Sequence, residues 1–234
     1  MQFGLWLPVY GGWLRARGFD VEPSAAESCT LAENAERLGF TALYGSENFL
    51  NCIHGPAHDI DDAWTLLAAI AARTRTIRLI GALKPGFRPA LVAAQMVATL
   101  DRISGGRVEV NIVTGWWSEE FARAGVAWQP HDEKYTIASS YLEEMEAIWA
   151  VSSDAEAPRR RLARAERPPI WVGGHSESAF AFASRHADVV FLNGMDPKGI
   201  KGMCARLASV SSHDVPPSIG NRGRSPGNQA GVAA

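Results

Sequence analysis

Short apolar runs alternate with longer amphipathic stretches along most of this chain of 234 residues. The short runs are rich in β-branched residues and end at glycine or polar residues, which is typical of buried strands. The longer stretches repeat apolar residues every three to four positions, as helices with one buried face do. We predict strands at Phe3–Val9, Thr41–Tyr44, Ile77–Leu83, Arg107–Gly115, Ile170–Val172 and Asp188–Leu192, and helices at Ser24–Leu38, Ala63–Arg75, Ala90–Ile103, His131–Trp149, Ser176–His186 and Lys198–Val210.

Residues that start and stop helices support these boundaries. Ser24 with Glu27 three positions later forms a capping-box pattern, and Gly39 follows as a stop signal. We also expect Asp61 to cap the second helix and Pro89 to open the third.

Strands that alternate with helices of this length predict parallel βαβ units. Six units without a GxGxxG sequence after the first strand favour an α/β fold of the TIM (β/α)8-barrel type over a dinucleotide fold. A closed barrel of that type has eight strands, so we predict an incomplete barrel domain over residues 1–210. The arginine-rich stretch 151–167 is expected to be an exposed connection, and residues 211–234, rich in Ser, Pro and Gly, a disordered tail.

Composition narrows the choice of partners and compartment. A net charge of −2 with 21% charged residues provides no basic surface for nucleic acid or anionic lipid. No apolar run reaches the length of a membrane span, and the start lacks the pattern of a secretion signal. Three widely spaced cysteines argue against a disulfide framework. We therefore expect a soluble cytoplasmic protein that binds neither nucleic acid nor membrane.

The strand Arg107–Gly115 and the helix start after it form the expected ligand-binding wall. Asn111 and Thr114 lie toward the carboxyl end of the strand, where parallel β/α folds bind ligands. His131 and Tyr135 are four residues apart at a helix start, so both side chains share one face.

Gly174 and Ser176 lie in a Gly-Gly-His-Ser turn between a strand and a helix. Such a turn presents backbone N–H groups, a helix dipole and a hydroxyl to a phosphate. The alternative is an ordinary turn with Ser176 as the helix cap.

Other candidates have more than one explanation. Trp116 and Trp117 either line a substrate cavity, or are buried under the long connection or at an oligomer interface. The group from His54 to Asp62 matches no standard metal-ligand spacing, so we predict no metal. The sequence that begins at Gly174 lacks the last glycine of the G-x-S-x-G nucleophile elbow. Cys52 is expected to be an unreactive thiol.

Several segments together resemble the luciferase-like flavin-dependent monooxygenases, and within them the dimethylsulfone and alkanesulfonate branch. These segments are Leu83–Gly86, Pro89–Gln95, Ala98–Arg107, Val110–Gly115, His131–Tyr135, Ile170–Gly174 and Phe191–Gly194. The resemblance implies a monooxygenase that uses FMNH₂ and O₂, with FMN reduced by a separate NAD(P)H-dependent flavin reductase. A flavin peroxide would cleave the carbon–sulfur bond of a small organosulfur compound, and the subunits would form dimers or tetramers.

The resemblance also implies roles for individual residues. Ser176, with Gly174, would hold the FMN phosphate. His131 and Tyr135 would contact the phosphate and ribityl chain, and Asn111 and Thr114 would lie along the flavin. Tyr10 would contact substrate together with Trp116 and Trp117. The catalytic residues stay unassigned.

Departures from the family pattern refine this prediction. The substrate would be a dimethylsulfone-like sulfone or an alkanesulfonate. Ile60 replaces a cysteine of the alkanesulfonate enzymes and Tyr10 replaces a histidine, which points toward the sulfone branch or another small sulfur compound. The last two barrel strands of the family are not recognisable, so an impaired family member is one alternative. A deazaflavin (F420)-dependent oxidoreductase on the same barrel is the other.

Overall fold

The computed structural model describes residues 2–11, 24–150, 162–163, 166–192 and 196–211. Within these residues, six strands form one parallel sheet in chain order. The strands are β1 Gly4–Trp6, β2 Ala42–Gly45, β3 Arg78–Leu83, β4 Val108–Ile112, β5 Ile170–Gly173 and β6 Val189–Phe191. The helices are α1 Ala25–Arg37, α2 Ala63–Arg73, α3 Ala90–Ser104, α4 Ser118–Arg123, α5 His131–Trp149, α6 Glu177–His186 and α7 Pro197–Ser211.

The sheet is strongly curled. Phe191 on β6 stacks on Tyr44 of β2, with ring centroids 5.7 Å apart, and its ring centroid lies 6.4 Å from that of Trp6 on β1. Because β1 and β6 are at opposite edges of the sheet, these contacts cross its concave face. The predicted β/α-barrel architecture with six βα units is therefore confirmed.

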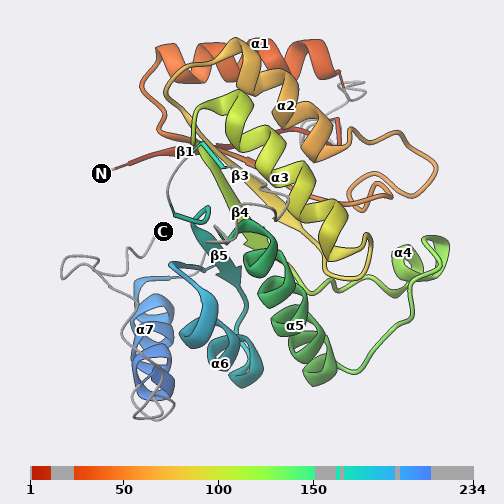
Figure 1. Cartoon of the computed structure of the whole chain (residues 1–234), viewed down its shortest axis with the longest axis vertical. Coiled ribbons are helices and arrows are strands. Elements are labelled where there is room, and N and C mark those ends of the chain that lie inside the picture. Colours follow the sequence, from red (N-terminus) through yellow and green to blue (C-terminus); the bar gives the residue numbers. More distant parts are fainter. Residues whose placement is uncertain (1, 12–23, 151–161, 164–165, 193–195, 212–234) are drawn as a thin grey trace, which may run out of the picture.

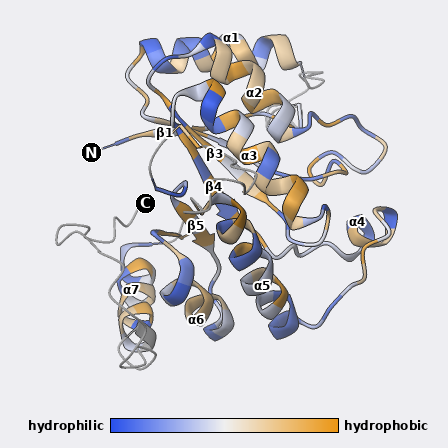
Figure 2. Cartoon of the chain, in the orientation of Figure 1, coloured by the Kyte–Doolittle hydropathy of each residue, from blue (hydrophilic) through white to orange (hydrophobic). Residues whose placement is uncertain are grey.

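Side-chain alternation along each strand separates two apolar layers. Leu43, Leu79 and Val110 face the helices and belong to the main core, whereas Ala42 and Ile80 face the concave side. Helices α1, α2, α3, α5, α6 and α7 pack against one another in chain order around the outside (Figure 1). Figure 2 shows β3 and β4 coloured mainly as hydrophobic, in keeping with their burial between helices and the concave layer.

Capping residues explain where α1 and α2 begin. The Ser24 side chain accepts a hydrogen bond from the Glu27 amide at 3.3 Å, and Gly39 follows α1 with a φ of +89°. Asp62, and not the predicted Asp61, caps α2, because its carboxylate accepts from the Thr65 amide at 2.8 Å. Pro89 precedes α3 as predicted.

Two predicted segments fall mostly outside the described residues: the connection 151–167 and the tail 211–234. The sequence also did not indicate α4, a short helix within the stretch between β4 and α5. None of the helices in the described part of the chain has the length and hydropathy needed to cross a bilayer.

Candidate active site

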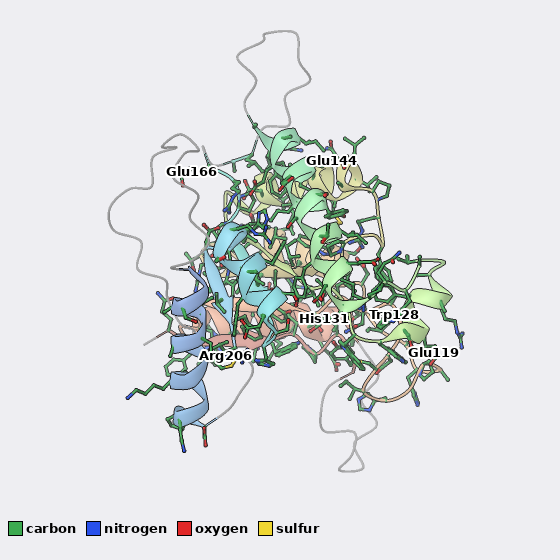
Figure 3. All side chains as sticks on the ribbon, turned by 90° about the horizontal axis from the view of Figure 1, so that it is seen from below. Glu119, Trp128, His131, Glu144, Glu166 and Arg206 are labelled. Atoms are coloured by element: carbon green, nitrogen blue, oxygen red, sulfur yellow. The ribbon has the colours of Figure 1, made fainter. Side chains whose placement is uncertain are left out.

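Four of the predicted site residues meet where α5 and α6 begin. His131 Nε2 lies 2.9 Å from Ser176 Oγ, and the His131 ring meets the Tyr135 ring edge-on at 5.3 Å. The Ser176 hydroxyl oxygen also accepts a hydrogen bond from the Ala179 amide at 3.1 Å, which caps α6. Figure 3 places His131 at the amino end of α5, far from Glu144 near the other end. The two helix starts therefore share one site at the carboxyl ends of the strands.

Gly174 allows the backbone to approach this site closely. Its φ is +146°, a conformation that residues with side chains rarely adopt. A Cβ here would lie 2.6 Å from the Ala179 Cβ and 3.1 Å from the Tyr135 hydroxyl oxygen. The turn at Gly174–Ser176 is thus a backbone cradle packed closely against α6, at the positive end of the α6 dipole, a favourable place for an anion.

Asn111 presents a free hydrogen-bond acceptor on β4. The residue is 2% exposed, and its Nδ2 donates to the Tyr44 hydroxyl at 2.7 Å. Its Oδ1 has no hydrogen-bond partner among the described residues. Burial raises the pKa of Tyr44 to about 12, so this phenol stays neutral. A buried acceptor of this kind costs free energy unless a ligand supplies a donor.

Tyr10 belongs to a second group, around the ends of β1, β2 and β3. Its hydroxyl accepts a hydrogen bond from Asn48 Nδ2 at 2.6 Å, and burial raises its pKa. Asn48 Oδ1 in turn accepts from Lys84 Nζ at 2.7 Å, and Lys84 forms a buried ion pair with Glu120 of α4. The predicted substrate contact is therefore held in a polar network.

That network continues into a buried cluster of four charges that sequence reasoning missed. Glu47 Oε1 accepts from Arg88 Nη1 at 2.5 Å, and Glu47 Oε2 accepts from the Lys84 amide at 2.6 Å. Burial raises the pKa of Glu47 and lowers that of Lys84, although each faces an opposite charge. One signal could have found this cluster: Glu47 and Lys84 follow β2 and β3 almost directly, at the ends where ligands bind.

Trp116 and Trp117 stack on each other after β4, with ring centroids 6.0 Å apart and planes inclined by 15°. Trp116 is 67% exposed, so it is not buried beneath the described part of the chain. Thr114, two residues earlier, lines a pocket of about 150 Å³ with Lys134.

Among the described residues, no group of three histidine, cysteine or acidic side chains could hold a metal ion. The His54 and His58 rings are 6.4 Å apart, and the nearby Cys52 is partly buried, with a pKa that burial raises.

Comparison with known proteins identifies the family of this chain. The model of the luciferase-like monooxygenase family matches residues 1–233. The chain is 32% identical to an FMNH(2)-dependent dimethylsulfone monooxygenase of Pseudomonas putida and 33% identical to one of Pseudomonas fluorescens (strain Pf0-1). Each alignment covers 92% of this chain but only 63% and 62% of the relatives, respectively.

A solved structure agrees. The monooxygenase RslO1 from Streptomyces bottropensis superimposes with a TM-score of 0.70 at 26% identity, over 91% of this chain and 66% of that one. The match to the family model spans nearly all of the sequence, and the fold agrees with it. The chain therefore belongs to the luciferase-like monooxygenase family.

Proposed function

We propose that this protein is an FMNH₂- and O₂-dependent monooxygenase that acts on a small organosulfur compound of the sulfone type. The observation that carries the proposal is the pairing of an anion cradle at Gly174–Ser176 with the unpartnered, buried carbonyl of Asn111. FMN has a phosphate that the cradle can bind, and its ring system has N–H groups that can donate a hydrogen bond to the Asn111 carbonyl. The residues present therefore fit this cofactor.

The cofactor would be held from both of its ends. Ser176 and the backbone at Gly174 bind the phosphate, and His131 orients the Ser176 hydroxyl through their 2.9 Å contact. Tyr135 lies beside His131, and it would contact the phosphate and ribityl chain. Asn111 accepts a hydrogen bond from the ring system, with Thr114 farther along the same segment. Bound FMNH₂ supplies the electrons that activate O₂.

The substrate assignment rests on the relatives and on single residues. The two relatives above are named dimethylsulfone monooxygenases, and Ile60 and Tyr10 agree with the sulfone branch. Tyr10, Trp116 and Trp117 are the proposed substrate contacts. Cleavage of the carbon–sulfur bond would yield an aldehyde and a sulfinate.

The proposal includes partners and a location. A separate NAD(P)H-dependent flavin reductase would supply FMNH₂, and we predict a homodimer or homotetramer in the cytoplasm. Cys29, Cys52 and Cys204 form no disulfide in the described part of the chain.

Two measurements test this function in order. The first is titration of the protein with FMN, oxidised and anaerobically reduced, against the Asn111→Leu variant, which keeps the side-chain size but removes the acceptor. The second adds a flavin reductase, NADH and dimethylsulfone, and measures formaldehyde and methanesulfinate. Tight binding of reduced FMN that weakens in Asn111→Leu, followed by product formation, supports the proposal. Absence of FMN binding, or binding without oxygenation of any sulfone, contradicts it.

A further inference from the structure

Lys134 on α5 is a buried ammonium group with no carboxylate partner among the described residues. The residue is 8% exposed, and its Nζ donates to the Gly115 carbonyl at 3.2 Å. The same Nζ lies 3.2 Å from the centroid of the Trp128 ring and 5.2 Å from that of Phe121. An ammonium group has three N–H donors, so one carbonyl leaves part of its hydrogen-bonding capacity unused, and the two rings stabilise its charge without a counter-ion.

This isolation is costly for the folded protein. Burial lowers the pKa of Lys134, and no opposite charge offsets the effect. The buried Lys84 and the partly buried Arg88 of the neighbouring cluster show the usual arrangement, since Lys84 pairs with Glu120 and Arg88 with Glu47. A buried charge is normally paired, because desolvation without a partner is unfavourable. A ligand with a negative charge would complete the site at Lys134.

Lys134 also lines a pocket of suitable size. The pocket measures about 150 Å³, roughly the liquid volume of five water molecules. Pro85 and Gly86 before α3, Val126 after α4, and Ile137 on α5 form apolar walls. The phosphate cradle is separate, because neither Gly174 nor Ser176 lines this pocket. In Figure 3, Trp128 lies between His131 on α5 and Glu119 on α4.

We propose that this pocket binds a small organic oxyanion, such as a short-chain sulfonate or carboxylate. The oxyanion would accept hydrogen bonds from Lys134, and its short apolar part would contact Val126 and Ile137. This site goes beyond the proposed oxygenation, and its test needs neither flavin nor turnover.

Methanesulfonate and dimethylsulfone form a matched pair of probes, because a methyl group in one replaces an oxygen in the other and only methanesulfonate is charged. Binding to the flavin-free protein is measured by saturation-transfer NMR on the methyl protons and by tryptophan fluorescence. Methanesulfonate should bind at least tenfold more tightly than dimethylsulfone, since hydrogen bonds to a charged group contribute roughly a factor of ten to one hundred. The Lys134 ammonium lies over the Trp128 ring, and a bound anion would draw it away from that ring. The fluorescence change should therefore disappear in Trp128→Phe.

Variants distinguish the pocket from other cationic surfaces. Lys134→Met removes the charge at similar size and should weaken methanesulfonate binding at least tenfold, whereas Lys134→Arg should retain binding. Lys201→Met, on the exposed face of α7, should leave it unchanged. Ala127→Phe fills the pocket while Lys134 stays in place, and it should also abolish binding, which tests the site even if Lys134→Met fails to fold.

Three results would overturn the proposal. The first is methanesulfonate binding that persists in Lys134→Met or Ala127→Phe. The second is inorganic sulfate binding as tightly as methanesulfonate, which would leave no role for the apolar walls. The third is displacement of methanesulfonate by FMN but not by riboflavin, which would assign Lys134 to the cofactor phosphate.

Discussion

Replacing Ser176 by aspartate separates its two roles, the cap of α6 and the proposed phosphate contact. Asp and Ser are about equally good N-cap residues, and a negative charge at this end favours the helix dipole. The carboxylate can accept from the Ala179 amide as the hydroxyl does now at 3.1 Å. We therefore expect the free energy of unfolding to change by less than about 0.5 kcal/mol.

The effect on FMN is large because two negative groups would share one cradle. At a separation of about 4 Å, each pair of unit charges repels by about 1 kcal/mol in water and about 4 kcal/mol near a protein surface. Even about 2 kcal/mol corresponds to a roughly thirtyfold loss of affinity. Riboflavin, which lacks the phosphate, should bind Ser176→Asp as it binds the unchanged protein.

The assay is titration of both flavins by fluorescence quenching, with Ser24→Asp as the control. Ser24 caps α1 through the Glu27 amide at 3.3 Å, so this variant makes the same chemical change away from the site. Added salt should partly restore FMN binding to Ser176→Asp, since screening weakens the repulsion. Equal losses for FMN and riboflavin, or no loss for either, would refute the phosphate assignment.

Gly174→Ala should destabilise the protein by about 1–3 kcal/mol in urea unfolding, because Gly174 has a φ of +146° and the Ala179 side chain is close to it. Gly202→Ala should not destabilise the protein, because the space beside Gly202 is open. Glu120→Ala leaves a buried ammonium unpaired and should cost about 3–5 kcal/mol, whereas the exposed Glu119→Ala should change stability by less than about 1 kcal/mol. Burial acts to raise the pKa of Glu36, but hydrogen bonds from the backbone and side chain of the α2–β3 connection lower it from 4.5 to about 2. Since its folded pKa is the lower one, its contribution to stability is complete above about pH 4.5 and is lost as pH falls toward 2. Thermal melting from pH 5 to pH 2 should show this loss, and Glu36→Gln should not.

The sequence predicted the parallel sheet because each strand and helix carries its own local signal. Hydrophobic periodicity marked the elements, and Ser24 and Pro89 marked helix starts that the structure confirms. Asp61 and Asp62 are adjacent and chemically identical, so only backbone geometry decides which one caps α2. The short helix α4 was missed, because its six residues are too few to show a periodic pattern.

The candidate site was predictable only where its residues are close in sequence or lie in a recognisable turn. His131 with Tyr135, and the turn at Ser176, could be identified this way, and the structure brings them together. Lys84 and Glu120 could not be paired in advance. They are 36 residues apart, and their contact depends on how the segment before α5 returns to the end of β3.

The segment between β4 and α5 connects the buried charges to the anion pocket. Glu120 anchors it by accepting from the Phe49 amide at 2.6 Å and by pairing with Lys84. The next residue, Phe121, fills the space beside Gly115 and lines the pocket, and Trp128 covers Lys134. A segment without Glu120 would lose its fixed position, and the aromatic rings around the Lys134 ammonium would move with it. We therefore expect the buried Lys84–Glu120 ion pair to support the shape of a pocket that it does not line.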